Sequence, residues 1–174
     1  MQTKTAFAIL VTALIGFSQK AICQKWIPVN QKEYSIKAPS NWSVDLSKQM
    51  GTDLVMFSML ENSNDKFREN VNVMVQNIAG KNINLEKFTT LSLNQVKTMA
   101  ADSKIEESKT IKTNNGSYQK IIYAATQGGL KLKFEQYYFI SNNKVYVVTL
   151  TTEANKFEIF RLLGEEILNS FVLK

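Results

Sequence analysis

Two pairs of adjacent carboxylates, Glu106-Glu107 and Glu165-Glu166, are the residues of this 174-residue sequence whose type and spacing could support acid–base chemistry. Paired carboxylates cleave glycosidic bonds when both face one substrate. Adjacent residues point to opposite faces of a strand and lie about 100° apart around a helix, so neither pair is expected to converge. We interpret both pairs as solvated surface and predict no catalytic residues.

Other catalytic and metal-binding arrangements are missing from the sequence. It contains no His and a single Cys, Cys23, so imidazole bases, His-rich metal sites and internal disulfides are excluded. The stretch Asn62-Ser63-Asn64-Asp65 resembles the start of a calcium loop, but Phe67 and Val73 stand where that loop requires Gly and Glu. Phosphate-loop, nucleophile-elbow and dinucleotide motifs are also absent. The sequence predicts no cofactor, no metal and no enzyme activity.

The N-terminus has the features of an export signal. Lys4 precedes an uncharged, apolar run over residues 6–17, which is too short to span a bilayer as a helix of roughly 20 residues. Small residues allow cleavage after Ser18 or after Cys23, and both sites remain open. We predict a signal peptide over residues 1–24, followed by one domain over residues 25–174 that is periplasmic or secreted in a Gram-negative bacterium and has no transmembrane helix.

Cys23 and the net charge bear on possible partners. A lipid anchor on Cys23 is disfavoured, because the preceding Lys20-Ala21-Ile22 is a poor lipobox. Removal of the signal peptide lowers the formal charge from +6 to +4. Arg68 and Arg161 are the only arginines, so the phosphate-reading surface that nucleic-acid binding favours is not expected.

Period-two alternation of apolar and polar residues predicts a sheet. Val71, Val73 and Val75 share one face of a strand, and the same alternation is seen from Leu130 to Phe134. Turn residues at Asn114-Asn115-Gly116, Gly128-Gly129 and Asn142-Asn143 divide the later strands. We expect a four-strand antiparallel meander over about 105–151, with its charged first strand near an edge. The other expected strands are Tyr34 to Ala38, Leu54 to Leu60 and Val71 to Ile78.

Two segments show helical periodicity instead. One begins after Asn84, a plausible N-cap, and extends to about Ala101. The second extends from about Glu153 to Asn169 and carries Glu158, Arg161 and Glu165 at ion-pair spacing on the side opposite its apolar stripe of Phe157, Phe160, Leu163 and Ile167. Gly164 interrupts this helix at a cost of about 1 kcal/mol, which a close approach to the sheet would explain.

These elements predict an α+β fold in which helices flank an antiparallel sheet of about six or seven strands. Residues 43–53 and 61–70 are polar and irregular, and their length is typical of binding loops. Tyr137 and Phe139 share a strand face with Lys131, Lys133 and Glu135. That aromatic end is either an exposed recognition patch or, as we favour, a surface covered by a helix.

The run from Tyr34 to Trp42 has the form Y-x-I-x-x-P-x-x-W, and the chain closes with Ile167-Leu168-Asn169-Ser170-Phe171. With the order of elements between them, these motifs resemble the PsbP-like family, which includes the photosystem II extrinsic subunit, the DcrB-like exported bacterial proteins and a nuclear Ran-binding member. The resemblance implies a single α/β/α sandwich that serves as a binding or accessory module. The matching residues, which we expect to have packing and chain-turning roles, are Tyr34, Pro39, Trp42 and Phe171.

We therefore expect an exported, non-enzymatic accessory protein of the bacterial cell envelope, closest in layout to the DcrB-like branch, whose partner is another envelope protein. Fold analogy does not identify that partner. A carrier of a small apolar ligand, held between sheet and helix, is the alternative. A His-free hydrolase is the third hypothesis and requires two carboxylates to meet in a pocket.

Overall fold

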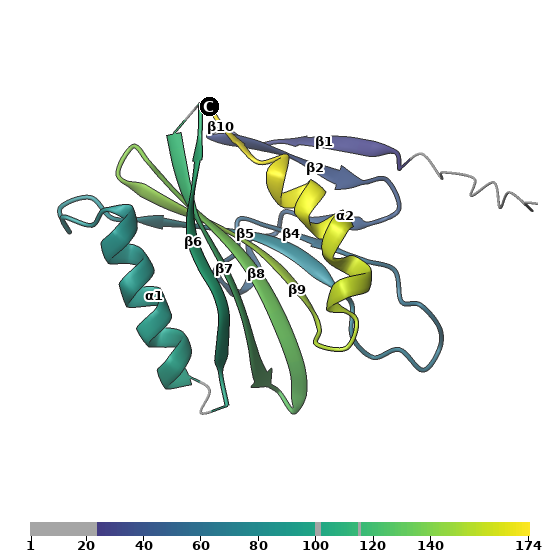
Figure 1. The fold of residues 1–174 in the computed structure, drawn as a ribbon. Coiled ribbons are helices and arrows are strands. Elements are labelled where there is room, and N and C mark those ends of the chain that lie inside the picture. Colours follow the sequence, from purple (N-terminus) through teal and green to yellow (C-terminus); the bar gives the residue numbers. More distant parts are fainter. Residues whose placement is uncertain (1–23, 100–101, 115) are drawn as a thin grey trace, which may run out of the picture.

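The computed structural model describes residues 24–99, 102–114 and 116–174. The predicted signal peptide, both cleavage sites and Cys23 therefore lie outside the described residues. A seven-stranded sheet with the order β3-β4-β5-β9-β8-β7-β6 dominates the fold, and every neighbouring pair is antiparallel (Figure 1). Its strands are β3 (Ser43–Asp45), β4 (Leu54–Phe57), β5 (Asn70–Asn77), β6 (Lys104–Thr113), β7 (Gly116–Gln127), β8 (Leu130–Ser141) and β9 (Lys144–Glu153).

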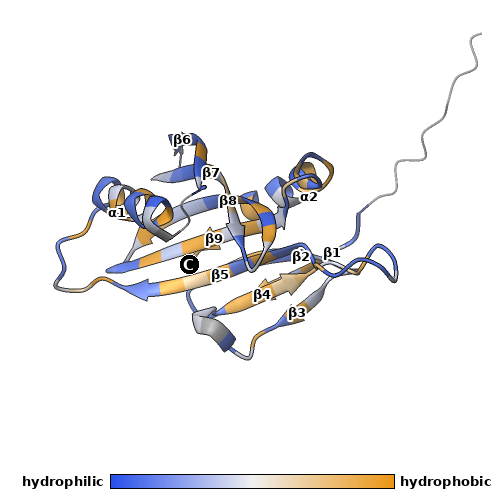
Figure 2. Cartoon of the chain, turned by 90° about the horizontal axis from the view of Figure 1, so that it is seen from below, coloured by the Kyte–Doolittle hydropathy of each residue, from blue (hydrophilic) through white to orange (hydrophobic). Residues whose placement is uncertain are grey.

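A second sheet has three strands in the order β1-β2-β10, namely Trp26–Asn30, Tyr34–Pro39 and Val172–Leu173. It shares a core with α2 (Phe157–Asn169) on one face of the large sheet, while α1 (Leu85–Met99) packs on the other face. Figure 2 shows the two helices on opposite sides of the curved β6–β8 part of the sheet. The predicted α+β sandwich, with helices on both faces of an antiparallel sheet, is thus confirmed.

The predicted meander is confirmed as β6 to β9, and β6 lies at the sheet edge, as its charges indicated. Two of its turns use the residues that the sequence singled out. Gly128 and Gly129 have φ values of 60° and 81°, and Asn142 and Asn143 have 50° and 58°. These left-handed conformations match the right-handed twist of the strands, which is why Gly and Asn are preferred there.

The first helix begins where its predicted cap lies. The Asn84 side-chain Oδ1 accepts a hydrogen bond of 2.8 Å from the backbone N–H of Lys87. From α1, Phe88 packs edge-on against Tyr138 of β8, with their ring centroids 5.2 Å apart. Ile121 and Val147 complete this apolar core around the helix.

The second helix begins at Phe157, four residues later than predicted, because β9 continues through Glu153 and a turn follows it. Its apolar stripe packs toward the sheet as expected. A Cβ atom added to Gly164 would lie 2.4 Å from Cδ2 of the buried Leu150 on β9. The close approach that Gly164 predicted is therefore confirmed.

Three short strands were not predicted: β1, β3 and β10. Pro28 lowers the strand propensity of β1, yet β1 pairs only with β2 and is an edge strand, where Pro is tolerated. The expected irregular stretch at residues 43–53 contains β3 and a short 3-10 helix, Gln49–Gly51. The expected strand from Leu54 ends earlier, at Phe57, and an irregular segment follows it.

The residues of the Y-x-I-x-x-P-x-x-W pattern have the packing roles that we expected. Tyr34, Trp42 and Phe171 are buried in the core shared by α2 and the small sheet. Pro39 ends β2, and its carbonyl accepts a hydrogen bond of 3.0 Å from the backbone N–H of Trp42. The motif therefore turns the chain from the small sheet toward β3.

Candidate functional site

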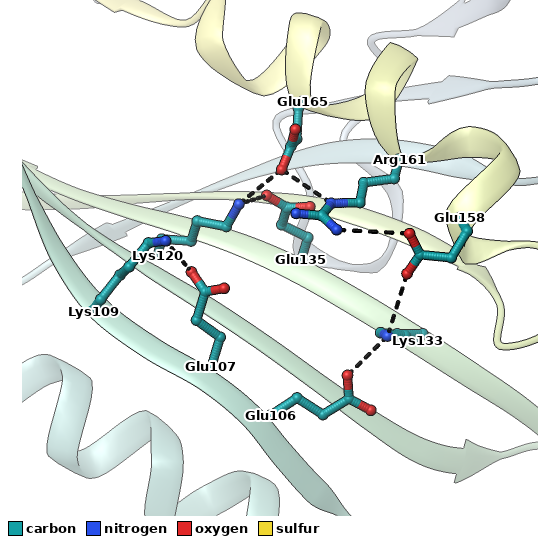
Figure 3. Close-up of polar contacts among 9 residues, drawn as sticks. All are labelled: Glu106, Glu107, Lys109, Lys120, Lys133, Glu135, Glu158, Arg161 and Glu165. Atoms are coloured by element: carbon teal, nitrogen blue, oxygen red, sulfur yellow. Dashed lines mark hydrogen bonds and ion pairs between the residues drawn. The ribbon is translucent and has the colours of Figure 1, made fainter.

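A buried lysine on β7, Lys120, joins α2 to the sheet through two carboxylates. Its Nζ lies 2.7 Å from Oε1 of Glu135 on β8 and 2.8 Å from Oε1 of Glu165 on α2 (Figure 3). Glu135 is completely buried, and Lys120 is nearly so. A buried carboxylate without a compensating cation is strongly destabilising, so Lys120 is the group that makes the position of Glu135 tenable.

Burial is the strongest influence on the pKa of all three groups. It raises the pKa of Glu135 above the ordinary value, and the contact with Lys120 offsets only part of that rise. Burial opposes ionisation of Glu165 as well, but its contacts with Lys120 and Arg161 prevail and lower its pKa. Burial would also lower the pKa of Lys120, yet the two carboxylates reverse this effect and raise it. Lys120 is therefore held as an ammonium ion and is unavailable as a nucleophile or base.

The same network continues toward solvent along α2. The Arg161 guanidinium lies 3.3 Å from Glu165 and 3.6 Å from Glu158, so the ion pairs that the helical spacing predicted are confirmed. Lys133 of β8 then links Glu158, at 3.9 Å, to Glu106 of β6, at 2.8 Å (Figure 3). The solvent-exposed pairs contribute little stability, and the buried end of the network dominates its energetics.

Two expectations about the acidic pairs are wrong. Glu165 is not solvated surface, because its side chain is mostly covered and contacts Lys120. Glu106 and Glu107 do not point to opposite faces, because a bulge between Ile105 and Glu107 inserts an extra residue. Both carboxylates therefore lie on the α2 side of the sheet, where Glu106 pairs with Lys133 and Glu107 with Lys109 (Figure 3).

Two carboxylates do meet in this network, as the hydrolase hypothesis requires, but they are Glu135 and Glu165 rather than an adjacent pair. They share the ammonium of Lys120 instead of facing an open space. Neither lines the large cleft described below. Their shared contact with Lys120 allows charged side chains to lie beneath α2. It leaves no open space between the two carboxylates in which a substrate bond could lie.

A second lysine, Lys156, fixes the loop over residues 58–69, which connects β4 to β5. Its Nζ lies 2.8 Å from Glu153, 3.3 Å from Glu61, 3.4 Å from Asp65 and 3.8 Å from Glu69. These contacts hold the 58–69 loop against the N-terminal end of α2, where Figure 1 shows it. The predicted binding loop at residues 61–70 is thus an ordered, acid-rich segment.

The electrostatics of this cluster favour a fixed cation. The contact with Glu153 is the largest cause of a raised pKa for Lys156, so it remains charged. Burial raises the pKa of Glu69, whose carboxylate is completely covered. Within the described residues, no group of three or more acidic or Cys side chains is arranged to hold a metal ion. The ammonium of Lys156 itself lies among the carboxylates of Glu61, Asp65, Glu69 and Glu153.

An open cleft of about 690 Å³ lies beyond the C-terminal end of α2, between β10 and the far ends of β7 and β8. Tyr118, Tyr137, Phe139 and Phe171 contribute aromatic rings to it. Of the two residues that the sequence analysis singled out here, Tyr137 is buried and Phe139 is half-buried. The favoured interpretation, cover of this aromatic end by a helix, holds for Tyr137, which is buried in a core with Leu168 of α2, and only in part for Phe139, which is half-buried beside the cleft.

Sequence reasoning missed Lys120, Glu135 and Lys156. Each is a charged residue in or beside a strand, and apart from Glu153, which is three residues before Lys156, the partners come from distant segments of the chain. The one available signal was Lys120 immediately before the apolar Ile121-Ile122, a charge at an inward-facing position. Within the described residues, no helix combines the length and apolar character that crossing a bilayer requires.

Comparison with known proteins relates this geometry to solved structures. No protein-family model matches the sequence, and a search of curated proteins finds no match. The solution structure of cyanobacterial PsbP (CyanoP) from Synechocystis sp. PCC 6803 is similar, with a TM-score of 0.68 and 15% identity over 92% of this chain and 99% of that chain.

Two further structures have the same architecture. A Pseudomonas aeruginosa protein of unknown function, PA94, gives a TM-score of 0.60 at 12% identity over 86% of this chain and 97% of its own. LpqN, involved in cell envelope biogenesis of Mycobacterium tuberculosis, gives 0.59 at 10% identity over 86% of this chain and 91% of its own. At these identities the likeness establishes the fold, and the chain has the PsbP-like fold that its sequence motifs predicted.

Proposed function

We propose that this chain is an exported accessory protein of the bacterial cell envelope that acts by binding a partner protein rather than by catalysis. The predicted signal peptide over residues 1–24 supports export to the periplasm or the medium of a Gram-negative bacterium. The likeness to CyanoP and to LpqN, which is involved in cell envelope biogenesis, supports an accessory role in that compartment.

The observation that carries the proposal is the set of exposed apolar side chains on two segments that Lys156 joins, α2 and the 58–69 loop. Ile159 and Leu162 lie one turn apart on the outer side of α2 and are 73% and 74% exposed. Met59 and Leu60, on the 58–69 loop, are exposed as well. Because Lys156 already fixes the loop against the start of α2, a partner would bind without first ordering these segments. Such preorganised apolar groups are typical of protein–protein contact sites.

Photocrosslinking in cells of the natural host tests this surface. A photoreactive residue at Ile159 or Leu162 should capture one reproducible partner, identified by mass spectrometry as an exported envelope protein. Leu91, which is 50% exposed on α1, provides the control position on the other side of the sheet. Equal capture from Leu91, or no capture from α2 under any growth condition, would contradict the proposal.

Intact-mass measurement of the exported protein tests its processing separately. Cleavage after Ser18 and cleavage after Cys23 leave different masses, and a chain that retains Cys23 and carries a lipid on it would have a larger mass increment. We expect an unlipidated chain cut at one of these two positions. A retained N-terminus would disprove export by this signal, whatever the crosslinking shows.

Binding of a small apolar ligand is the second candidate function. The cleft beyond α2 favours it, because its volume falls within the range of about 300–1,000 Å³ that is typical of ligand pockets. Native mass spectrometry of protein purified from its own host should then reveal a bound mass. That mass should disappear on denaturation, and its absence from gently isolated protein would exclude the carrier function.

A further inference from the structure

The walls of the cleft beyond α2 are built from connected aromatic rings. Tyr118 of β7 lies between Tyr137 and Phe139 of β8, with ring-centroid distances of 4.7 and 5.1 Å and interplanar angles of 32° and 29°. Phe171 continues the series at 4.9 Å from Phe139. Tyr137 and Phe171 are buried, whereas Tyr118 and Phe139 are half-buried and keep surface that a ligand could contact.

The cleft offers a ligand no ionic partner. None of its lining residues is acidic or basic, and burial keeps Tyr137 in its neutral form by raising its pKa. The Lys120 ammonium lies behind the Tyr137 ring, 5.8 Å from its centroid, and it is engaged by Glu135 and Glu165. A charged ligand entering the cleft would lose hydration without gaining a counter-ion.

Three lining residues, Thr113, Ser117 and Asn169, carry neutral polar side chains. Ser117 and Asn169 contribute a hydroxyl and an amide. Neutral polar groups beside aromatic and aliphatic side chains suit a site that orients an uncharged ligand. An aromatic ligand gains about 0.5–1.5 kcal/mol from ring stacking beyond its buried area, a gain that an acyl chain lacks.

We propose that the aromatic cleft between the end of α2 and strands β7 and β8 binds uncharged molecules that carry a planar aromatic ring. This inference rests on the second candidate function and specifies the chemistry of its ligand. The ring of the ligand extends the series formed by Tyr118 and Phe139, and its polar substituents contact Ser117 or Asn169.

Two fluorescent probes that differ by one anionic group test the selectivity. N-phenylnaphthylamine is neutral, and anilinonaphthalenesulfonate is the same aromatic framework with a sulfonate. Titrated into the purified exported protein, the neutral probe should bind at least about tenfold more tightly, because only the sulfonate must be desolvated without a partner. A neutral phenyl-bearing competitor should displace it, whereas a straight-chain alcohol of similar size should not.

Three variants locate the binding. Tyr118→Ala removes the central ring and should weaken the neutral probe roughly tenfold. Tyr123→Ala removes a stacked ring from the opposite face of the same strand, where Tyr123 contacts Phe134 at 4.7 Å, and should leave probe affinity unchanged. Val172→Lys changes a 56% exposed lining residue, so it should fold normally and selectively strengthen the sulfonate probe.

The outcomes separate this inference from the function on which it rests. Equal affinity for both probes, or equal weakening by Tyr118→Ala and Tyr123→Ala, would overturn the inference. If Tyr118→Ala does not fold, the test depends on Val172→Lys. The inference would then be overturned if Val172→Lys showed the same preference for the neutral probe as the unchanged protein. Selective binding together with no natural ligand in native mass spectra would uphold the chemistry of the cleft and exclude a carrier role.

Discussion

The two faces of the β6–β8 part of the sheet are each covered by one helix, but the contacts differ in kind. Under α1 the contacts are mostly apolar, with Phe88 against Tyr138 at their centre. Under α2, apolar packing is combined with ion pairs from Lys120 and Lys133 to the helix. Within the described residues, every ion pair between a helix and the large sheet lies on the α2 side.

This difference indicates how each helix is held in position. Apolar contacts are non-directional, so α1 is positioned mainly by side-chain shape and by its cap. The ion pair from α2 is directional, because Glu165 shares the Lys120 ammonium with the fully buried Glu135, and a shift of α2 would remove one of the two carboxylates that hold this buried cation. We infer that α2 is fixed more tightly than α1, in keeping with its position beside both proposed binding surfaces.

The largest expected effect comes from breaking the buried pair. Lys120→Met should lower the free energy of unfolding by about 3–5 kcal/mol at neutral pH, because Glu135 would be left buried without a cation. Urea denaturation measures the loss. The double variant Lys120→Met/Glu135→Leu serves as the control and should recover most of it, since an apolar pair of similar volume removes the charge altogether.

The same variant has a defined pH dependence. Burial raises the pKa of Glu135 above its ordinary value of 4.5 in the folded protein. A raised folded-state pKa contributes stability at low pH that is lost as the pH rises through it. The defect of Lys120→Met should therefore shrink as the pH falls from neutral toward 4.5. A defect below about 1 kcal/mol that does not change with pH would contradict the proposed role of the network.

The next effect concerns the apolar face. Phe88→Ala should reduce stability by about 3 kcal/mol, the lower end of the range for this substitution, because the ring contacts Tyr138 near the edge of the core. Hydrogen exchange should accelerate throughout α1 and remain unchanged in α2. Leu91→Ala, at a half-exposed position on the same helix, should change stability by less than about 0.5 kcal/mol. Equal acceleration in both helices would show that the two faces are not independent.

Features that depend on local sequence were predictable. The turns at Gly128-Gly129 and Asn142-Asn143, the cap at Asn84 and the ion-pair spacing around Arg161 each involve residues within a few positions of one another. Gly164 was informative for a similar reason, because a helix tolerates Gly poorly unless a close contact requires it.

Features that depend on distant segments were not predictable. Glu135 has the sequence surroundings of a surface strand residue, and its burial follows only from the positions of Lys120 and α2. The bulge at Glu106 places one of the two glutamate side chains on the face of the sheet opposite to the one expected. Nothing in the Glu106-Glu107 pair itself indicates a bulge. Residues 61–70 were expected to be irregular, but the attachment of the 58–69 loop through Lys156 requires contacts across a separation of many residues. Much of the candidate site therefore emerges only at the level of tertiary structure.

A smaller effect is expected where α2 approaches β9. Gly164→Ala gains about 1 kcal/mol in helix propensity but forces a methyl group against Leu150, which costs about 1–3 kcal/mol. We expect a net loss of about 1 kcal/mol in thermal or urea denaturation. Shortening the neighbour in Gly164→Ala/Leu150→Val should relieve the clash, so the two substitutions should be less than additive. Stabilisation by Gly164→Ala alone would mean that the helix can move away from the sheet.

The last effect, of similar size, concerns the starts of the two helices. Asn84→Ala removes the hydrogen bond to the Lys87 N–H and should cost about 1 kcal/mol. Lys156, which precedes α2, makes no side-chain cap, and its four carboxylate contacts hold that end instead. Hydrogen exchange in Asn84→Ala should therefore accelerate only in the first turn of α1. If hydrogen exchange also accelerated at the start of α2, the attachment of α2 to the 58–69 loop would be weaker than the Lys156 contacts imply. The difference between the two faces of the sheet would then not extend to the helix ends.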